Sequence, residues 1–135
     1  MKTAFRYLTA LLFFAIVVQV GLAGYGAFNA IDEADGGPVT QKTIENGFDP
    51  HGILGTIVLL LMLILVIVSL TAGRIRARTV TVLLVLGIVQ MLLAWGATGA
   101  AWVGFLHGIN ALAIAGIAGS LAGDEWRRAR VASTV

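Results

Sequence analysis

Four long runs of apolar residues dominate the chain, and short polar segments separate them. The runs cover about residues 7–28, 51–72, 80–97 and 101–122. A helix needs about 20 apolar residues to cross a bilayer. None of the runs shows the alternation of apolar and polar residues that indicates a membrane β-barrel. The pattern therefore predicts four transmembrane helices, with an outer loop at residues 31–49.

The composition supports a membrane protein. Hydrophobic residues make up 59% of the 135 residues and charged residues only 12%, so the chain cannot cover a soluble surface with charge. It has no cysteine, which excludes disulfides, thiolate metal sites and cysteine nucleophiles. The net charge of +2 gives no reason to propose nucleic-acid binding. We expect residues 1–135 to form a single integral membrane domain.

The distribution of charge predicts the orientation of the helices. If four helices cross in sequence, one side receives the basic residues Lys2, Arg6, Arg74, Arg76, Arg78, Arg127, Arg128 and Arg130. The other side receives Lys42 together with the acidic residues Asp32, Glu33, Asp35, Glu45 and Asp49. Because basic loops stay in the cytoplasm, we expect a multi-pass protein of the cell inner (plasma) membrane with both termini cytoplasmic. The length of the first run favours a retained helix over a cleaved signal peptide.

Two short phrases each occur twice. Residues 47–53 (GFDPHGI) resemble residues 104–109 (GFLHGI), and these phrases contain the only two histidines. Upstream of each lies a second shared phrase, residues 19–24 (QVGLAG) and 90–96 (QMLLAWG). A repeat of this kind predicts the architecture. We expect an all-α transmembrane four-helix bundle built from two similar helical hairpins.

The two histidines are the candidate ligands. Ionisable residues inside a membrane span are costly and usually functional. If the hairpins are related by a pseudo-two-fold axis, His51 and His107 face each other in the outer half of the bundle. Two opposed imidazoles match the axial ligands of a six-coordinate haem, whereas zinc requires three or four ligands. The sequence therefore predicts haem b, with its iron bound by both histidines.

Small residues beside the histidines would leave room for the flat face of a porphyrin. They are Gly55, Gly104, Gly108 and Ala111. Small residues also allow helices to approach closely, which is the alternative interpretation. The N-termini of the second and fourth helices, with Lys42, would attract the haem propionates to the outer side.

Three amide side chains are candidates for holding the histidines in position. A metal-bound histidine usually donates its second N–H to an acceptor. The carbonyl of Gln19 and that of Gln90 could each accept from one histidine, and Asn110 could serve His107. Hydrogen bonds between helices, with no ligand role, are the alternative.

Local signals predict where the helices end. Asp49 can cap a second helix that begins at Pro50, and Thr79 can cap the third. A tight turn at Thr98-Gly99 joins the third and fourth helices. The segment from Asp124 to Arg130 keeps a helical composition, and the three tryptophans are expected to anchor the helices at the membrane interfaces.

Taken together, these residues resemble a family of small bacterial four-helix membrane proteins of unknown function. The residues that carry the resemblance are Gln19, Leu22, Ala23, Gly24, Phe48, His51, Gly55, Gln90, Leu106, His107, Asn110 and Ala111. The sequence departs from the pattern at Gly108, where we would expect proline. The resemblance implies the four-helix architecture and the importance of the paired histidines, but no activity. Their arrangement is also similar to that of membrane b-type cytochromes.

The leading functional hypothesis is a b-type haem protein that carries electrons near the outer face. Its candidate partners are membrane lipid, a quinone, a redox partner protein or a second copy of the chain. The first alternative is a cofactor-free accessory or assembly subunit of a larger membrane complex, and the second has each histidine binding a separate pigment or a transported species. The sequence shows no nucleophile–base pair and no phosphate-binding glycine motif, so we do not predict a hydrolase or a transferase.

Overall fold

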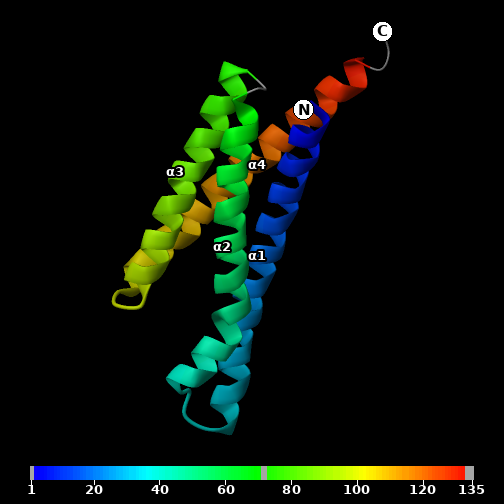
Figure 1. Cartoon of the computed structure of the whole chain (residues 1–135). Coiled ribbons are helices and arrows are strands. Elements are labelled where there is room, and N and C mark those ends of the chain that lie inside the picture. The colour runs from blue at the N-terminus through cyan, green and yellow to red at the C-terminus, as the bar shows by residue number, and fades with distance from the viewer. Residues whose placement is uncertain (1, 71–72, 133–135) are drawn as a thin grey trace.

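The computed structural model describes residues 2–70 and 73–132 as four long α-helices that run antiparallel in succession (Figure 1). The helices are α1 (Lys2–Gly36), α2 (Gln41–Ser69), α3 (Arg74–Ala97) and α4 (Ala101–Ala132). Each contains a segment long and apolar enough to cross a membrane. The prediction of an all-α, four-helix protein is confirmed.

The segment predicted to be an outer loop is mostly helical, so that prediction is wrong. Only residues 37–40 lie outside the helices there. The Thr40 hydroxyl accepts a hydrogen bond from the Thr43 amide at 3.2 Å and caps α2. Asp49 therefore caps nothing, and Pro50 lies inside α2, whose first turns stand at an angle to the rest (Figure 1). A proline inside a helix removes one backbone hydrogen bond and bends the axis.

The other helix ends agree in part with the prediction. The end of α3 at Ala97 and the start of α4 at Ala101 are as expected, and Gly99 closes the turn by donating to the Gly96 carbonyl at 3.2 Å. Helix α3 starts after Gly73, whose φ of 110° favours glycine, so Thr79 does not cap it. Helix α1 begins before residue 7, and α4 continues well past residue 122. The predicted end of the second helix at residue 72 lies outside the described residues.

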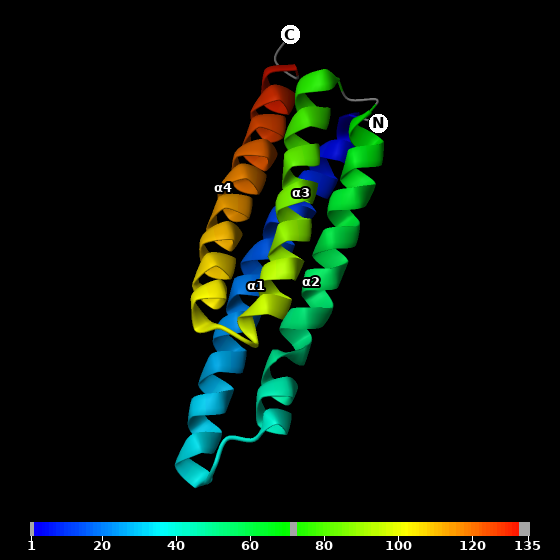
Figure 2. The ribbon, with the colours of Figure 1, turned by 90° about the vertical axis from the view of Figure 1, so that its left-hand side faces the viewer.

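The helices pack around a square. Helix α1 contacts α2 and α4, helix α3 contacts α2 and α4, and no close backbone approach crosses either diagonal within residues 2–70 and 73–132. One end of the bundle holds the start of α1, the end of α2, the start of α3 and the end of α4 (Figures 1 and 2). At the other end, α1 and α2 extend beyond the turn between α3 and α4. Side chains must therefore fill the space between α2 and α4.

The buried core lies in the half of the bundle nearer the termini. Several of its members are spaced seven residues apart and form a stripe along one face of a helix. The stripes comprise Phe5 and Leu12 on α1, Val58 and Leu65 on α2, Leu83 on α3, and Ile114 and Leu121 on α4. One heptad further towards the α3–α4 turn, the same positions carry Gln19, His51, Gln90 and His107. The candidate site is thus a polar layer that continues the core.

Helices α1 and α2 approach most closely at two glycines, Gly26 and Gly47. A Cβ atom added at Gly47 would lie 3.2 Å from the backbone oxygen of Gly26, and one at Gly26 would lie 2.9 Å from the Phe48 ring. Both glycines are buried. Their small size lets the two helices pack tightly one turn outside His51.

We expect Gly47→Leu to destabilise the protein by about 1–3 kcal/mol, because a larger side chain there must push α1 and α2 apart. Thermal unfolding of the purified protein in detergent would measure the loss. Gly21→Leu is the matched control, since an added Cβ at Gly21 meets no atom within 4 Å. Equal stability of the two variants would contradict the close approach.

Candidate functional site

The structure brings the two histidines together across the α2–α4 diagonal. The ring centroids of His51 and His107 are 6.2 Å apart, and the ring planes make an angle of 60°. Both side chains are half-buried. The Phe48 ring meets the His51 ring edge-on at 6.3 Å and closes one side of the site. Residues 56 positions apart in the sequence thus form a single imidazole pair.

A reciprocal pair of hydrogen bonds holds His51 against α1. Its Nδ1 lies 3.0 Å from the backbone oxygen of Gln19 and donates to it, since a carbonyl can only accept. In return, the Gln19 side-chain amide donates to the backbone oxygen of His51 at 2.7 Å. The Gln19 Oε1 atom is buried and has no hydrogen-bond partner within the described structure. These bonds fix the direction of the His51 ring.

His107 is held against α3 by a longer network. Its Nδ1 donates to the backbone oxygen of Gln90 at 3.1 Å, and the Gln90 amide nitrogen lies 3.1 Å from Nε2 of the same ring. Asn110 donates to the backbone oxygen of Leu86 at 3.0 Å and to Oε1 of Gln90 at 2.7 Å. Because Oε1 of Gln90 accepts from Asn110, its amide nitrogen must face His107. Gln90 therefore donates to Nε2 of His107.

These bonds determine the tautomer of both rings. Each neutral imidazole carries its proton on Nδ1 and its lone pair on Nε2, and in His107 that lone pair already accepts the hydrogen bond from Gln90. An unprotonated Nε2 can bind a metal. A histidine that does so usually donates its Nδ1–H to a carbonyl or carboxylate oxygen, as both rings do here. The two rings differ in one respect. Gln90 donates to Nε2 of His107, whereas no described side chain donates to Nε2 of His51.

The separation of the rings can be compared with that expected for two ligands of one metal. A metal–imidazole bond is about 2.0 Å, and a ring nitrogen lies about 1.2 Å from its ring centre. Two opposed ligands then place their ring centres about 6.4 Å apart, close to the observed 6.2 Å. The separation of the ring centres is therefore close to that of two histidine ligands on one metal.

The small residues differ from one another in what surrounds them. A Cβ at Gly55 would lie 2.9 Å from the Gln19 amide nitrogen, so this glycine makes room for Gln19. A Cβ at Gly104 would touch Ala97 at 3.7 Å, and one at Gly108 would meet nothing within 4 Å. Ala111 is half-buried on the same helix. Two glycines on α4, Gly104 and Gly108, are neighbours of His107. Of these, only Gly108 has no atom within 4 Å of an added Cβ.

Two details of the predicted support are corrected. The acceptors for the histidines are the backbone oxygens of the glutamines, and Asn110 bonds Gln90 rather than His107. The start of α2 is ten residues before His51, about 15 Å away along the helix. Lys42 and that helix N-terminus thus lie nearly three helical turns from His51, and their role towards the propionates stays a prediction. Only the N-terminus of α4, six residues before His107, lies near it.

Sequence reasoning missed two contacts that join the ends of the helices near the termini. The Arg6 guanidinium lies 4.8 Å from the centre of the Trp126 ring, and Tyr7 meets the same ring edge-on at 5.7 Å. Arg76 on α3 pairs with the buried Glu125 on α4 at 2.6 Å. The sequence did offer a signal for the ion pair, because Asp124 and Glu125 are the two acidic residues at an end of the bundle that is otherwise rich in arginine.

Within the described residues, no group of three or more His, Cys, Asp or Glu side chains comes together as a metal site. The histidine pair is therefore the one arrangement there that we consider for a metal. No protein-family model, no curated protein and no solved structure matches the chain. The geometry of the site is therefore the basis on which we infer function.

Proposed function

We propose that the protein is a membrane b-type haem protein in which His51 and His107 are the axial ligands of one iron. The observation that carries this proposal is the 6.2 Å separation of two rings whose Nδ1 atoms are both bonded to backbone carbonyls. That arrangement places the lone pair of each ring on Nε2, and a metal would have to displace the Gln90 amide from Nε2 of His107. Haem with two histidine ligands supplies one-electron transfer and has no open position for oxygen.

Several features support membrane insertion. In the most apolar stretch of each helix, only 11–28% of the residues are buried inside the bundle. Leucine, isoleucine, valine and phenylalanine side chains cover much of the remaining surface, and lipid is the solvent that suits such a surface. Eight of the nine basic residues fall at the end with the termini, which we assign to the cytoplasmic side.

The matching bonds within α1–α2 and within α3–α4 support a repeated hairpin. In each pair, a histidine Nδ1 donates to the backbone oxygen of a glutamine on the preceding helix. The two glutamines begin one of the repeated phrases of the sequence, and the two histidines lie within the other. We therefore infer that the chain holds two copies of one hairpin, which deliver one ligand each.

The position of the site suggests its role. His107 lies between the core residue Ile114 and the start of α4 at Ala101, so an iron between the histidines would be near the outer face. From there it cannot carry electrons across the whole membrane alone. We infer an electron carrier that exchanges electrons with a quinone or with an outer-side redox partner.

Absorption spectra of the purified protein, oxidised and reduced, test this proposal. Protein purified from haem-replete cells should be red and show a b-type spectrum that shifts on reduction. Extraction of the pigment should yield about one haem per chain if one pair of ligands binds it. A colourless preparation would contradict the proposal.

One observation favours a second function, that of a cofactor-free accessory subunit of a membrane complex. The Gln90 amide already donates to Nε2 of His107 at 3.1 Å, so this histidine is fully bonded without a metal. On this alternative, the histidines serve only to join the helices. Colourless protein that purifies together with other membrane subunits would support it.

The Gln90 contact leads to a prediction about haem binding. Because metal binding must displace the amide from Nε2, Gln90→Leu should tighten haem capture by the apo-protein about fivefold, the value of one ordinary hydrogen bond. Titration of the apo-protein with haem would measure the change. Gln19→Leu is the matched control, since Gln19 donates to a backbone oxygen and not to a ring nitrogen. Weaker capture by Gln90→Leu than by Gln19→Leu would contradict the competition.

A further inference from the structure

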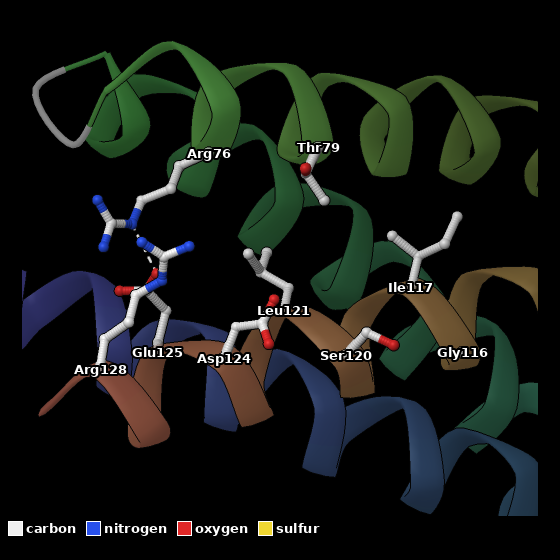
Figure 3. Close-up of a pocket in the computed structure, with 9 residues that line it drawn as sticks. All are labelled: Arg76, Thr79, Gly116, Ile117, Ser120, Leu121, Asp124, Glu125 and Arg128. Atoms are coloured by element: carbon white, nitrogen blue, oxygen red, sulfur yellow. Dashed lines mark hydrogen bonds and ion pairs between the residues drawn. The ribbon is translucent and has the colours of Figure 1, made fainter. Parts of the chain in front are cut away.

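A cavity of about 320 Å³ lies between α3 and α4 near the end that carries the termini, far from the histidines. Figure 3 shows Arg76 and Thr79 on α3 facing a row of α4 side chains across it. The charged groups gather at one end, and Gly116 and Ile117 lie towards the other. From Gly116 to Arg128 the groove follows twelve residues of helix, about 18 Å.

The charges at the mouth of this groove leave one cation available. Glu125 is buried and pairs with Arg76 at 2.6 Å, and Asp124 pairs with Arg127. Arg128 also lines the cavity, is exposed, and makes no ion pair with the residues that the structure describes. Most of the other basic residues belong to the same end of the bundle. The mouth is therefore suited to an anion.

The rest of the groove is suited to a hydrocarbon chain. It is lined by Ile117 and Leu121, with the Ser120 hydroxyl beside them. A Cβ added at Gly116 would meet no atom within 4 Å, so the groove is open at that point. In the proposed orientation, the charged end lies at the cytoplasmic surface and the apolar end points into the bilayer.

We propose that this groove binds an anionic phospholipid of the cytoplasmic leaflet. Arg128 contacts the phosphate of the headgroup, Ser120 lies along the path, and the upper part of an acyl chain lies against Gly116 and Ile117. Basic pockets between transmembrane helices on the cytoplasmic side bind such headgroups. The inference rests on the proposed membrane orientation and is independent of haem.

Native mass spectrometry of the full chain in detergent tests the proposal, with phosphatidylglycerol and phosphatidylcholine of identical chains as probes. We expect preferential retention of phosphatidylglycerol. Arg128→Gln should lower that retention about fivefold, the effect of one arginine near the headgroup, and leave phosphatidylcholine unchanged. Arg78→Gln is the matched control, because Arg78 is exposed, has the same charge and does not line the cavity.

Two further comparisons identify the ligand. Gly116→Leu fills the groove and should reduce retention of phosphatidylglycerol, whereas Gly21→Leu should not. Inorganic phosphate at the same concentration should fail to displace the lipid. Equal retention of the two lipids, equal effects of Arg128→Gln and Arg78→Gln, or displacement by inorganic phosphate would each overturn the proposal. Absorption spectra of the same samples report on haem separately.

Discussion

Replacing either His51 or His107 by alanine is expected to abolish the spectrum of six-coordinate haem while the protein remains in the membrane. Each variant removes one of the two proposed axial ligands, and the sequence contains no third histidine and no cysteine that could replace it. The haem content should fall close to background in the double variant. Spectra of membranes and of purified protein, with immunodetection of the chain, would measure both quantities.

Loss of colour must be separated from loss of fold. Each histidine contributes one hydrogen bond to a backbone oxygen on a neighbouring helix, worth about 1 kcal/mol. The variants should therefore unfold at slightly lower temperature and still purify as intact protein. Thr56→Ala and Thr98→Ala serve as controls, because both threonines are exposed and bond only their own helices. An unchanged spectrum in either histidine variant would exclude the proposed ligands.

Much of this site was predictable because it is built on local repetition. The repeated phrases indicated that His51 and His107 belong together, and the glutamine upstream of each proved to be its partner. A second signal was present but unused. Gln19 follows Leu12 by seven residues, and His107 precedes Ile114 by seven, so the polar residues occupy core positions. Heptad register alone could have placed the histidines inside the bundle.

The details of hydrogen bonding were not predictable from the sequence. The rotamer of Gln90 determines whether His107 donates to its side-chain oxygen or to its backbone oxygen. Asn110 donates to the side-chain oxygen, so His107 bonds the backbone oxygen. Such a choice involves three residues on two helices. Sequence spacing gives the faces of helices but not the orientation of an amide.

Helix ends were the weakest prediction for a different reason. Hydropathy shows only which part of a helix is apolar. The helix itself can continue into water, because its backbone hydrogen bonds and a capping side chain satisfy the polar groups there. Thr40 supplies such a cap, so α2 begins ten residues before His51 in spite of the charged composition there. Pro50, read as the first helical position, is tolerated within the helix at the cost of a bend.

Removing the buried carboxylate of Glu125 is expected to cause the largest loss of stability among single variants outside the site. Its side chain is 6% exposed, and that of its partner Arg76 is 23% exposed. Glu125→Gln would leave the arginine charge partly buried without this carboxylate. Breaking a fully buried pair costs about 3–5 kcal/mol, and the partial exposure of Arg76 lowers our expectation to about 2–3 kcal/mol. Thermal unfolding in detergent would measure it.

The adjacent ion pair provides the control. Asp124 and Arg127 are 50% and 69% exposed, so solvent screens their attraction and Asp124→Asn should cost about 0–1 kcal/mol. Replacing both members of the buried pair by leucine should recover much of the stability, because no charge is then left buried. The order of stability should be Asp124→Asn, then the double leucine variant, then Glu125→Gln. If Glu125→Gln were as stable as Asp124→Asn, the Arg76–Glu125 pair would not be holding α3 against α4, and the groove between these helices would lack its fixed charged end.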